Sequence, residues 1–139
     1  MRPWSLGVTA NWSLSGMLAI RFTAPIEPRP APRADSHDRQ RYSPKWYRQW
    51  KADFGLFARL AMKGQPPLEC PLKLSAQFFK LKPKNPQSRN YGDLDNLLKA
   101  VKDAMNGICY KDDSQVVQYG SCGKFHGQPL IQITLEEIP

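Results

Sequence analysis

Three short stretches of this sequence alternate apolar and polar residues, and two longer stretches repeat apolar residues every three or four positions. The alternation over 17–23, 72–79 and 130–136 predicts strands that bury one face, and a further strand is expected around 115–119. The longer repeats predict helices that bury one side. In a chain of 139 residues these elements predict a single α+β or α/β domain, in which one mixed four-stranded sheet is backed by two helices.

The first expected helix is rich in aromatic residues. Ser43 is its expected N-cap and Pro44 its first residue, and we expect the helix to stop at Gly64. This spacing favours packing in the core, and an aromatic platform that stacks on DNA bases is the alternative. The residues at helical spacing are Trp46, Trp50, Phe54, Phe57 and Ala61.

Residues 1–16 show no periodic pattern. We expect them to be a flexible tail or an extension from an overlong start-codon assignment, followed by the domain at 17–139. No apolar run approaches the roughly 18 residues that a membrane span requires. The three cysteines show no ligand spacing, which fits free thiols in a reducing cytoplasm better than a disulfide framework.

Basic residues outnumber acidic ones by 20 to 12, which gives a formal net charge of +8. This balance favours a polyanionic partner such as nucleic acid, although a lysine-rich surface that only maintains solubility has the same composition. Many of the charges fall in two proline-containing loops that we expect at 25–41 and 80–92. The candidate DNA-binding residues in these loops are Arg29, Arg33, Arg39, Arg41, Lys82, Lys84 and Arg89.

The second expected helix lies between two acidic pairs. Asp93 and Asp95 open it, and an Asn-Gly pair ends it. Asp112 and Asp113 then precede the next strand. Because Mg²⁺ and Mn²⁺ prefer oxygen ligands, and the connection after the helix can return Asp113 beside the helix start, we expect a divalent-metal site here. Helix caps, first-turn carboxylates and turn residues are the simpler explanations of the same aspartates.

Two charged residues follow the first acidic pair at intervals of one helical turn. Lys99 could offset negative charge that develops on a phosphate, and Asp103 lies one turn later. Both residues could equally belong to an ordinary i,i+4 ion pair.

The segment DLDNLLKAVKDAMNG, followed by YKDDSQVV, resembles the RusA family of Holliday junction resolvases, which are small endodeoxyribonucleases of bacteria and their phages. The resemblance extends more loosely over residues 17–136. It implies a cytoplasmic, Mg²⁺-dependent nuclease, with Mn²⁺ expected to substitute, that resolves four-way DNA junctions by paired symmetric cleavage. It also implies a homodimer with two active sites and no membrane partner.

The resemblance implies roles for individual residues as well. Asp93, Asp95 and Asp113 correspond to catalytic carboxylates that bind the metal. Lys99 corresponds to the catalytic lysine. The residues with supporting roles are Asn96, Asp103 and Asp112.

The sequence departs from the family pattern at two positions. Many relatives have proline before the first aspartate, where this chain has Gly92. Lys124 lies one position later than the lysine of the family's following strand, which leaves a DNA-contact role for Lys124 open. The residues alone also allow a non-catalytic DNA-binding module, or a metal-dependent nuclease that acts on flaps, forks or duplex DNA.

Overall fold

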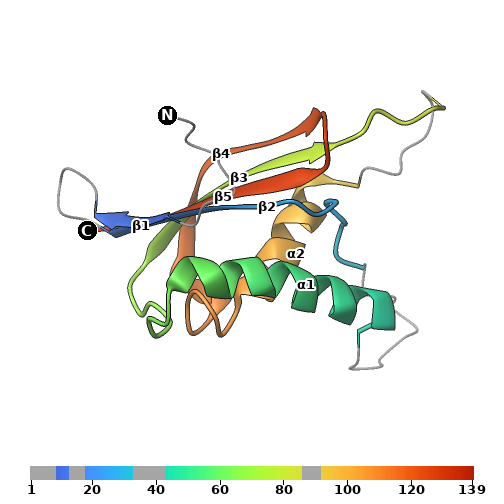
Figure 1. Cartoon of the computed structure of the whole chain (residues 1–139). Coiled ribbons are helices and arrows are strands. Elements are labelled where there is room, and N and C mark those ends of the chain that lie inside the picture. The colour runs from blue at the N-terminus through green and yellow to red at the C-terminus, as the bar shows by residue number, and fades with distance from the viewer. Residues whose placement is uncertain (1–8, 13–17, 33–42, 86–91) are drawn as a thin grey trace.

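The computed structural model describes residues 9–12, 18–32, 43–85 and 92–139 of the chain (Figure 1). Their centre is a mixed sheet of five strands in the order β1-β2-β5-β3-β4. β3 and β4 are parallel, whereas the other neighbouring strands are antiparallel. The strands are β1 (Thr9–Trp12), β2 (Leu18–Ala24), β3 (Leu72–Lys80), β4 (Val116–His126) and β5 (Leu130–Glu137).

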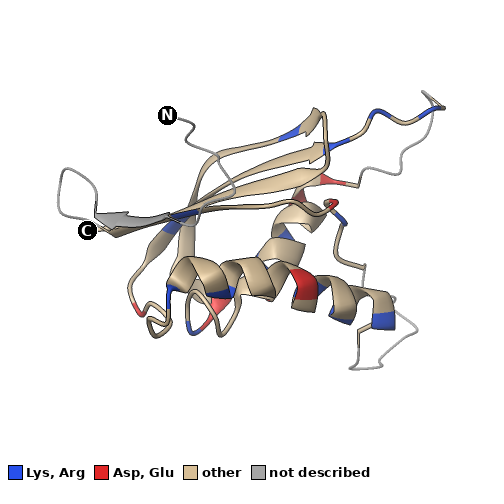
Figure 2. Ribbon diagram, viewed as in Figure 1, with Lys and Arg blue, Asp and Glu red and all other residues tan. Residues whose placement is uncertain are grey.

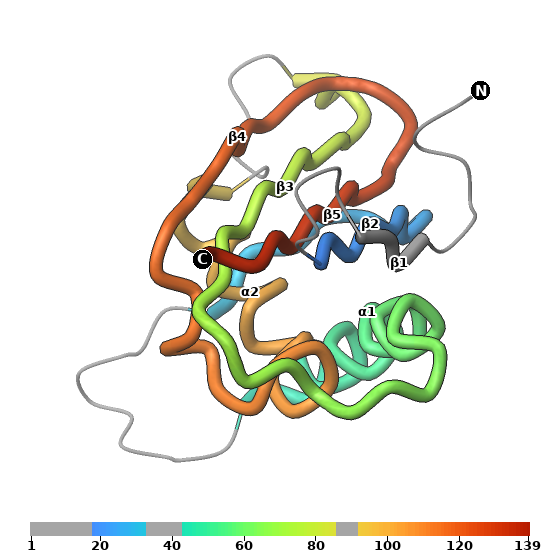
Figure 3. Tube along the Cα trace, turned by 90° about the vertical axis from the view of Figure 1, so that its left-hand side faces the viewer, coloured from blue at the N-terminus to red at the C-terminus, as the bar shows by residue number. Residues whose placement is uncertain are grey.

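Two helices, α1 (Lys45–Met62) and α2 (Leu94–Met105), cover one face of the sheet. Figure 3 shows both helices on the same side of it. The core lies between these two layers, and it includes every second residue of β3, from Leu72 to Phe78. A short 3₁₀ turn, η1 (Asp113–Gln115), leads into β4.

The predicted mixed sheet with two helices on one face is confirmed, because the four expected strands correspond to β2, β3, β4 and β5. β1 adds a short fifth strand, which pairs with β2 and comes from residues that the sequence analysis left outside the fold. The assignment of 1–16 to a tail or a start-codon extension stays a prediction. Among the described residues, no helix is both long enough and apolar enough to cross a membrane.

The aromatic residues of α1 mostly pack in the core, as predicted. Trp50 and Phe54 are buried and stacked, with ring centroids 5.4 Å apart, and Phe54 also contacts Phe22 of β2. Such ring pairs add to the stabilisation that burial of their area provides. Trp46 is the exception, because it lies at the helix start and is 38% exposed.

Both helices begin and end where backbone conformation changes. α1 begins one residue later than predicted: extended Pro44 takes the N-cap position expected of Ser43, and no side chain caps the helix. Lys63 in the left-handed conformation and Gly64 end it. α2 ends at Asn106, as its Asn-Gly pair predicted.

β4 is much longer than predicted and carries two irregularities. Its register against β3 shifts between Leu72 and Lys73, and again between Leu74 and Ala76. At each shift β4 uses one residue more than β3, which is the pattern of a β-bulge. Bulges interrupt simple alternation, so the sequence pattern could not show the full length of this strand.

Candidate functional site

Asp93 and Asp95 lie at the start of α2. Figure 2 shows acidic positions at this start of the helix, at one end of the sheet. Asp93 is the N-cap residue, but its side chain makes no capping hydrogen bond, and Asp95 lies in the first turn. Both residues are exposed. The amide groups of a helix start carry partial positive charge, so this end of α2 is a favourable place for two acidic side chains.

Gly92 connects this acidic pair to the loop after β2. Its φ of +93° lies in the region that favours glycine, and a Cβ built on it would lie 2.8 Å from the ring of Pro30. Ala31, which follows Pro30, donates a backbone hydrogen bond to the Asn96 carbonyl at 3.0 Å. Proline, with its φ fixed near −65°, does not fit at position 92, which explains the departure from the family pattern.

Lys124 reaches the same place from β4. Its Nζ donates a 3.0 Å hydrogen bond to the carbonyl of Gly92, the residue before Asp93. The second bulge of β4 absorbs one extra residue before Lys124, which explains its later position in the sequence. The role of Lys124 was left open from the sequence. Its contact with Gly92 could have been predicted only from a sign of the bulge in the stretch 120–123, which contains two glycines.

Lys99, Asp103 and Tyr47 form a chain of polar contacts along α2. The Lys99 Nζ lies 3.5 Å from Oδ2 of Asp103, so the i,i+4 ion pair is present. The Tyr47 hydroxyl donates a 2.8 Å hydrogen bond to the same oxygen. Burial raises the pKa of Tyr47 well above its usual range, and the hydrogen bond with Asp103 raises it further. Tyr47, which the sequence analysis did not select, therefore stays protonated and holds Asp103 in place.

Asp112 and Asp113 lie in the turn before β4. The Asp112 side chain accepts a 3.1 Å hydrogen bond from the Ser114 amide. A hydrogen bond with the Ser114 side chain, and then this backbone bond, lower the pKa of Asp112. Asp112 therefore caps η1, as the turn explanation predicted. Asp113 is the first residue of η1 and is partly exposed.

The two acidic pairs lie at opposite ends of α2, although the sequence analysis expected Asp113 to return beside the helix start. Val116 pairs with Leu72 and Lys124 with Phe78. Six residues of β3 separate these two points, or about 20 Å at roughly 3.3 Å per residue. The 12 residues of α2 give a similar length, about 18 Å at 1.5 Å per residue. In the described part of the chain, no three histidine, cysteine or acidic side chains gather closely enough to hold a metal.

The predicted DNA-binding residues are only partly within the described structure. The Arg29 guanidinium lies 4.1 Å from the centroid of the Trp46 ring, in the loop that also contacts Gly92. Lys82 and Lys84 are exposed in the segment after β3 (Figure 2). The predicted residues outside the described ranges are Arg33, Arg39, Arg41 and Arg89.

A comparison with protein families matches residues 25–136 to RusA, described as endodeoxyribonuclease RusA. The chain belongs to the RusA family. The match includes both acidic ends of α2 and Lys124, and it identifies the protein as a member of a nuclease family. The RusA assignment therefore supports a nuclease over a DNA-binding module without catalysis.

One curated protein also resembles part of this RusA-family chain. The uncharacterized protein YqaN of Bacillus subtilis (strain 168) is 41% identical over 46 residues. The aligned part covers 33% of this chain and 32% of YqaN, so this chain matches about a third of that protein's length. The likeness to YqaN adds no activity to the family assignment.

The close contact between Gly92 and Pro30 gives the first prediction. Gly92→Ala should destabilise the protein more than Gly64→Ala, since Gly64 has a similar positive φ but nothing within 4 Å of a built Cβ. Both changes incur the left-handed backbone cost of about 1–2 kcal/mol, and crowding should add about 1–3 kcal/mol at position 92 alone. Urea unfolding of the two variants measures the difference, and equal losses would contradict the packing of Pro30 against Gly92.

Proposed function

We propose that this protein is a Mg²⁺-dependent endodeoxyribonuclease that resolves four-way DNA junctions by paired symmetric cleavage. The main support for this proposal is an exposed pair of carboxylates, Asp93 and Asp95, at one helix start in a RusA-family chain of net charge +8. The junction substrate follows the resemblance of the DLDN and KDDSQVV segments to Holliday junction resolvases. A bacterial or phage-encoded enzyme of this kind would work in the cytoplasm.

The acidic pair has the chemistry that a divalent cation needs. Asp93 and Asp95 are exposed hard-oxygen donors on one helix start, and Mg²⁺ is commonly held by one or two carboxylates together with substrate phosphates. When bound, Mg²⁺ or Mn²⁺ would polarise the scissile phosphodiester and activate the attacking water. The two carboxylates would orient the ion at the helix start.

Lys99 would act next to this pair. It lies one helical turn after Asp95, and its exposed ammonium would approach the scissile phosphate and offset the negative charge that develops there. Asp103, held by Tyr47, would limit the positions of the Lys99 ammonium. Asn96 would support the site through the backbone bond that ties Ala31 to α2, and Asp112 through its cap of η1.

Basic residues around the same end of the sheet would bind the DNA backbone. Lys124 binds the Gly92 carbonyl, and Arg29 directly precedes Pro30, whose ring lies against Gly92. Phosphate contacts of this kind position a protein on DNA without reading its sequence. The remaining candidates are Arg33, Arg39, Arg41, Lys82, Lys84 and Arg89.

The role of Asp113 as a third metal ligand would require a second subunit. Because Asp113 follows the far end of α2, and the helix spans about 15 Å from Asp95 to Met105, one chain would not bring both carboxylates to the same ion. In a two-fold dimer, Asp93 and Asp95 of one protomer would meet Asp113 of the partner subunit, and the symmetric arrangement would form the second site. Two such sites suit two symmetric cuts.

This arrangement predicts where the dimer interface lies. A two-fold axis that places the start of α2 in one protomer beside the end of α2 in its partner would pass near the middle of the helix length. This point lies beside the first half of β4. There the edge strand carries two exposed apolar residues, Val117 at 63% and Tyr119 at 47% exposure. Exposed apolar residues on an edge strand favour contact with another chain.

Asp95→Asn tests the nuclease proposal. The change should lower cleavage of a synthetic four-way junction by about 100-fold or more, since loss of even a residue that supports a metal ligand typically costs 10–100-fold. Junction binding without Mg²⁺ should be retained or become tighter, because one negative charge near the phosphates is removed. Asp53→Asn, on the exposed side of α1, is the matched control. Near-normal cleavage by Asp95→Asn would contradict the assignment of Asp95 as a metal ligand. If the wild-type protein cleaves linear duplex as well as it cleaves the junction, a metal-dependent nuclease without junction preference is favoured.

Combining Val117→Lys with Tyr119→Lys tests the interface. We expect this double variant to shift from dimer to monomer in light scattering and to lose Mg²⁺-dependent cleavage, because four added positive charges would face one another across the axis. Leu60→Lys, at a position 61% exposed on α1, should leave the mass unchanged. A monomeric wild-type protein, or a dimer that survives the double change, would exclude this interface.

A further inference from the structure

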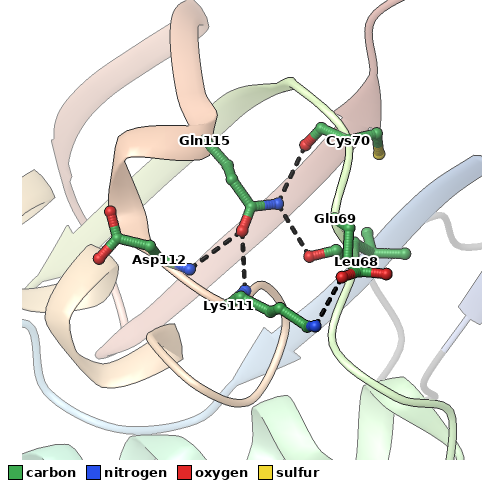
Figure 4. A network of polar contacts seen from close by, with 6 residues as sticks. All are labelled: Leu68, Glu69, Cys70, Lys111, Asp112 and Gln115. Atoms are coloured by element: carbon green, nitrogen blue, oxygen red, sulfur yellow. Dashed lines mark hydrogen bonds and ion pairs between the residues drawn. The ribbon is translucent and has the colours of Figure 1, made fainter.

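The side-chain amide of Gln115 uses its full hydrogen-bonding capacity (Figure 4). Its Oε1 accepts hydrogen bonds from the backbone amides of Lys111 and Asp112, at 2.9 and 3.0 Å. Its Nε2 donates to the backbone carbonyls of Leu68 and Cys70, at 2.8 and 3.1 Å. One side chain thus satisfies four backbone groups in two segments that are more than 40 residues apart in sequence.

These hydrogen bonds fasten the turn that carries Asp113 to the segment that enters β3. Backbone bonds join the same segments, from Leu68 N to the Cys109 carbonyl at 2.9 Å and from Lys111 N to the Leu68 carbonyl at 3.3 Å. Lys111 and Glu69 also form an ion pair, but both side chains are largely exposed, and such pairs contribute little. The partly buried Gln115 amide is therefore the main side-chain link between the two segments.

The position of Asp113 depends on this link. η1 has only three residues, and a 3₁₀ helix of this length has weak hydrogen bonds of its own. Gln115 binds the backbone of Lys111 and Asp112, just before Asp113, and ends the turn two residues after it. Within the described ranges, the Asp113 carboxylate accepts no hydrogen bond. Its direction is therefore set by the backbone that Gln115 holds.

We propose that Gln115 is a positioning residue for the nuclease reaction, because its amide fixes the turn that presents the Asp113 carboxylate to a divalent cation. This inference rests on the proposed role of Asp113 as a metal ligand. Glutamate and methionine cannot replace the amide. Glutamate would point a carboxylate oxygen at the carbonyls of Leu68 and Cys70. Methionine would remove all four hydrogen bonds of the amide, and would leave Lys111 N and the Leu68 carbonyl only their 3.3 Å bond to each other.

Gln77 offers a matched control for Gln115. It is also a glutamine, and its Nε2 also links two strands, because it donates to the Ser121 carbonyl at 2.9 Å and to the Ser121 hydroxyl at 3.3 Å. Gln77 lies within β3, and its amide binds Ser121 of β4 rather than a residue of η1 or of the start of α2. Changes at Gln77 therefore report the general cost of losing an amide link between β3 and β4.

The test compares Gln115→Glu and Gln115→Met with Gln77→Glu and Gln77→Met in the full chain. We expect the Gln115 variants to fold by circular dichroism and to bind a four-way junction without Mg²⁺ as the wild type does. The Mg²⁺ concentration for half-maximal cleavage should rise by about 10–100-fold, as for other residues that orient a metal ligand. Excess Mg²⁺ should restore most of the rate, and the Gln77 variants should keep the wild-type Mg²⁺ dependence.

Three outcomes would overturn the inference, and Asp113→Asn separates them. Normal Mg²⁺ dependence in the Gln115 variants, with cleavage lost in Asp113→Asn, would overturn the positioning role alone. Retained cleavage by Asp113→Asn would overturn both this role and the proposed metal role of Asp113. Unfolding of both Gln115 variants, or their loss of junction binding at every Mg²⁺ concentration, would show that Gln115 only stabilises the fold.

Discussion

The fixed length of α2 is the constraint on which the rest of this structure depends. Its apolar face is buried against the sheet and α1, and the Tyr47 hydrogen bond to Asp103 adds a polar link between the two helices. A packed helix neither bends nor shortens at low cost. The acidic groups at its two ends are therefore held apart, at about 18 Å along the axis. If one metal site uses both groups, as we propose, it would take them from two chains.

The two ends of α2 differ in electrostatic character. At its start, exposed Asp93 and Asp95 lie among basic residues, since Lys124 binds the Gly92 carbonyl and Lys99 follows one turn later. Under the proposed function such a mixture suits a phosphate diester and a cation together, because the carboxylates would bind the cation and the lysines would attract the DNA backbone. The opposite end carries Asp113 on a turn that Gln115 joins by hydrogen bonds to the segment before β3.

The alternating patterns of β2, β3 and β5 and the helical repeats predicted the layered fold, because each of these elements buries one regular face. The length of β4 was underestimated, since its bulges and its exposed edge remove the regular alternation of apolar and polar residues. The motif predicted the candidate site residues, but it did not predict how far apart they lie. Sequence spacing shows that Asp93 and Asp113 flank a helix, whereas the direction of the chain after the helix depends on contacts with residues such as Leu68, more than 40 positions earlier.

Mixing two inactive variants tests the shared active site most directly. Asp95→Asn and Asp113→Asn proteins, each inactive alone, would be mixed until their subunits exchange, with two affinity tags used to isolate the mixed dimers. If the sites are shared between subunits, each mixed dimer contains one site with both substitutions and one with neither. It should therefore nick a supercoiled cruciform plasmid and give open circles without linear product. Mixed dimers that form but leave the plasmid uncut would contradict the account, because each chain would then need its own Asp95 and Asp113.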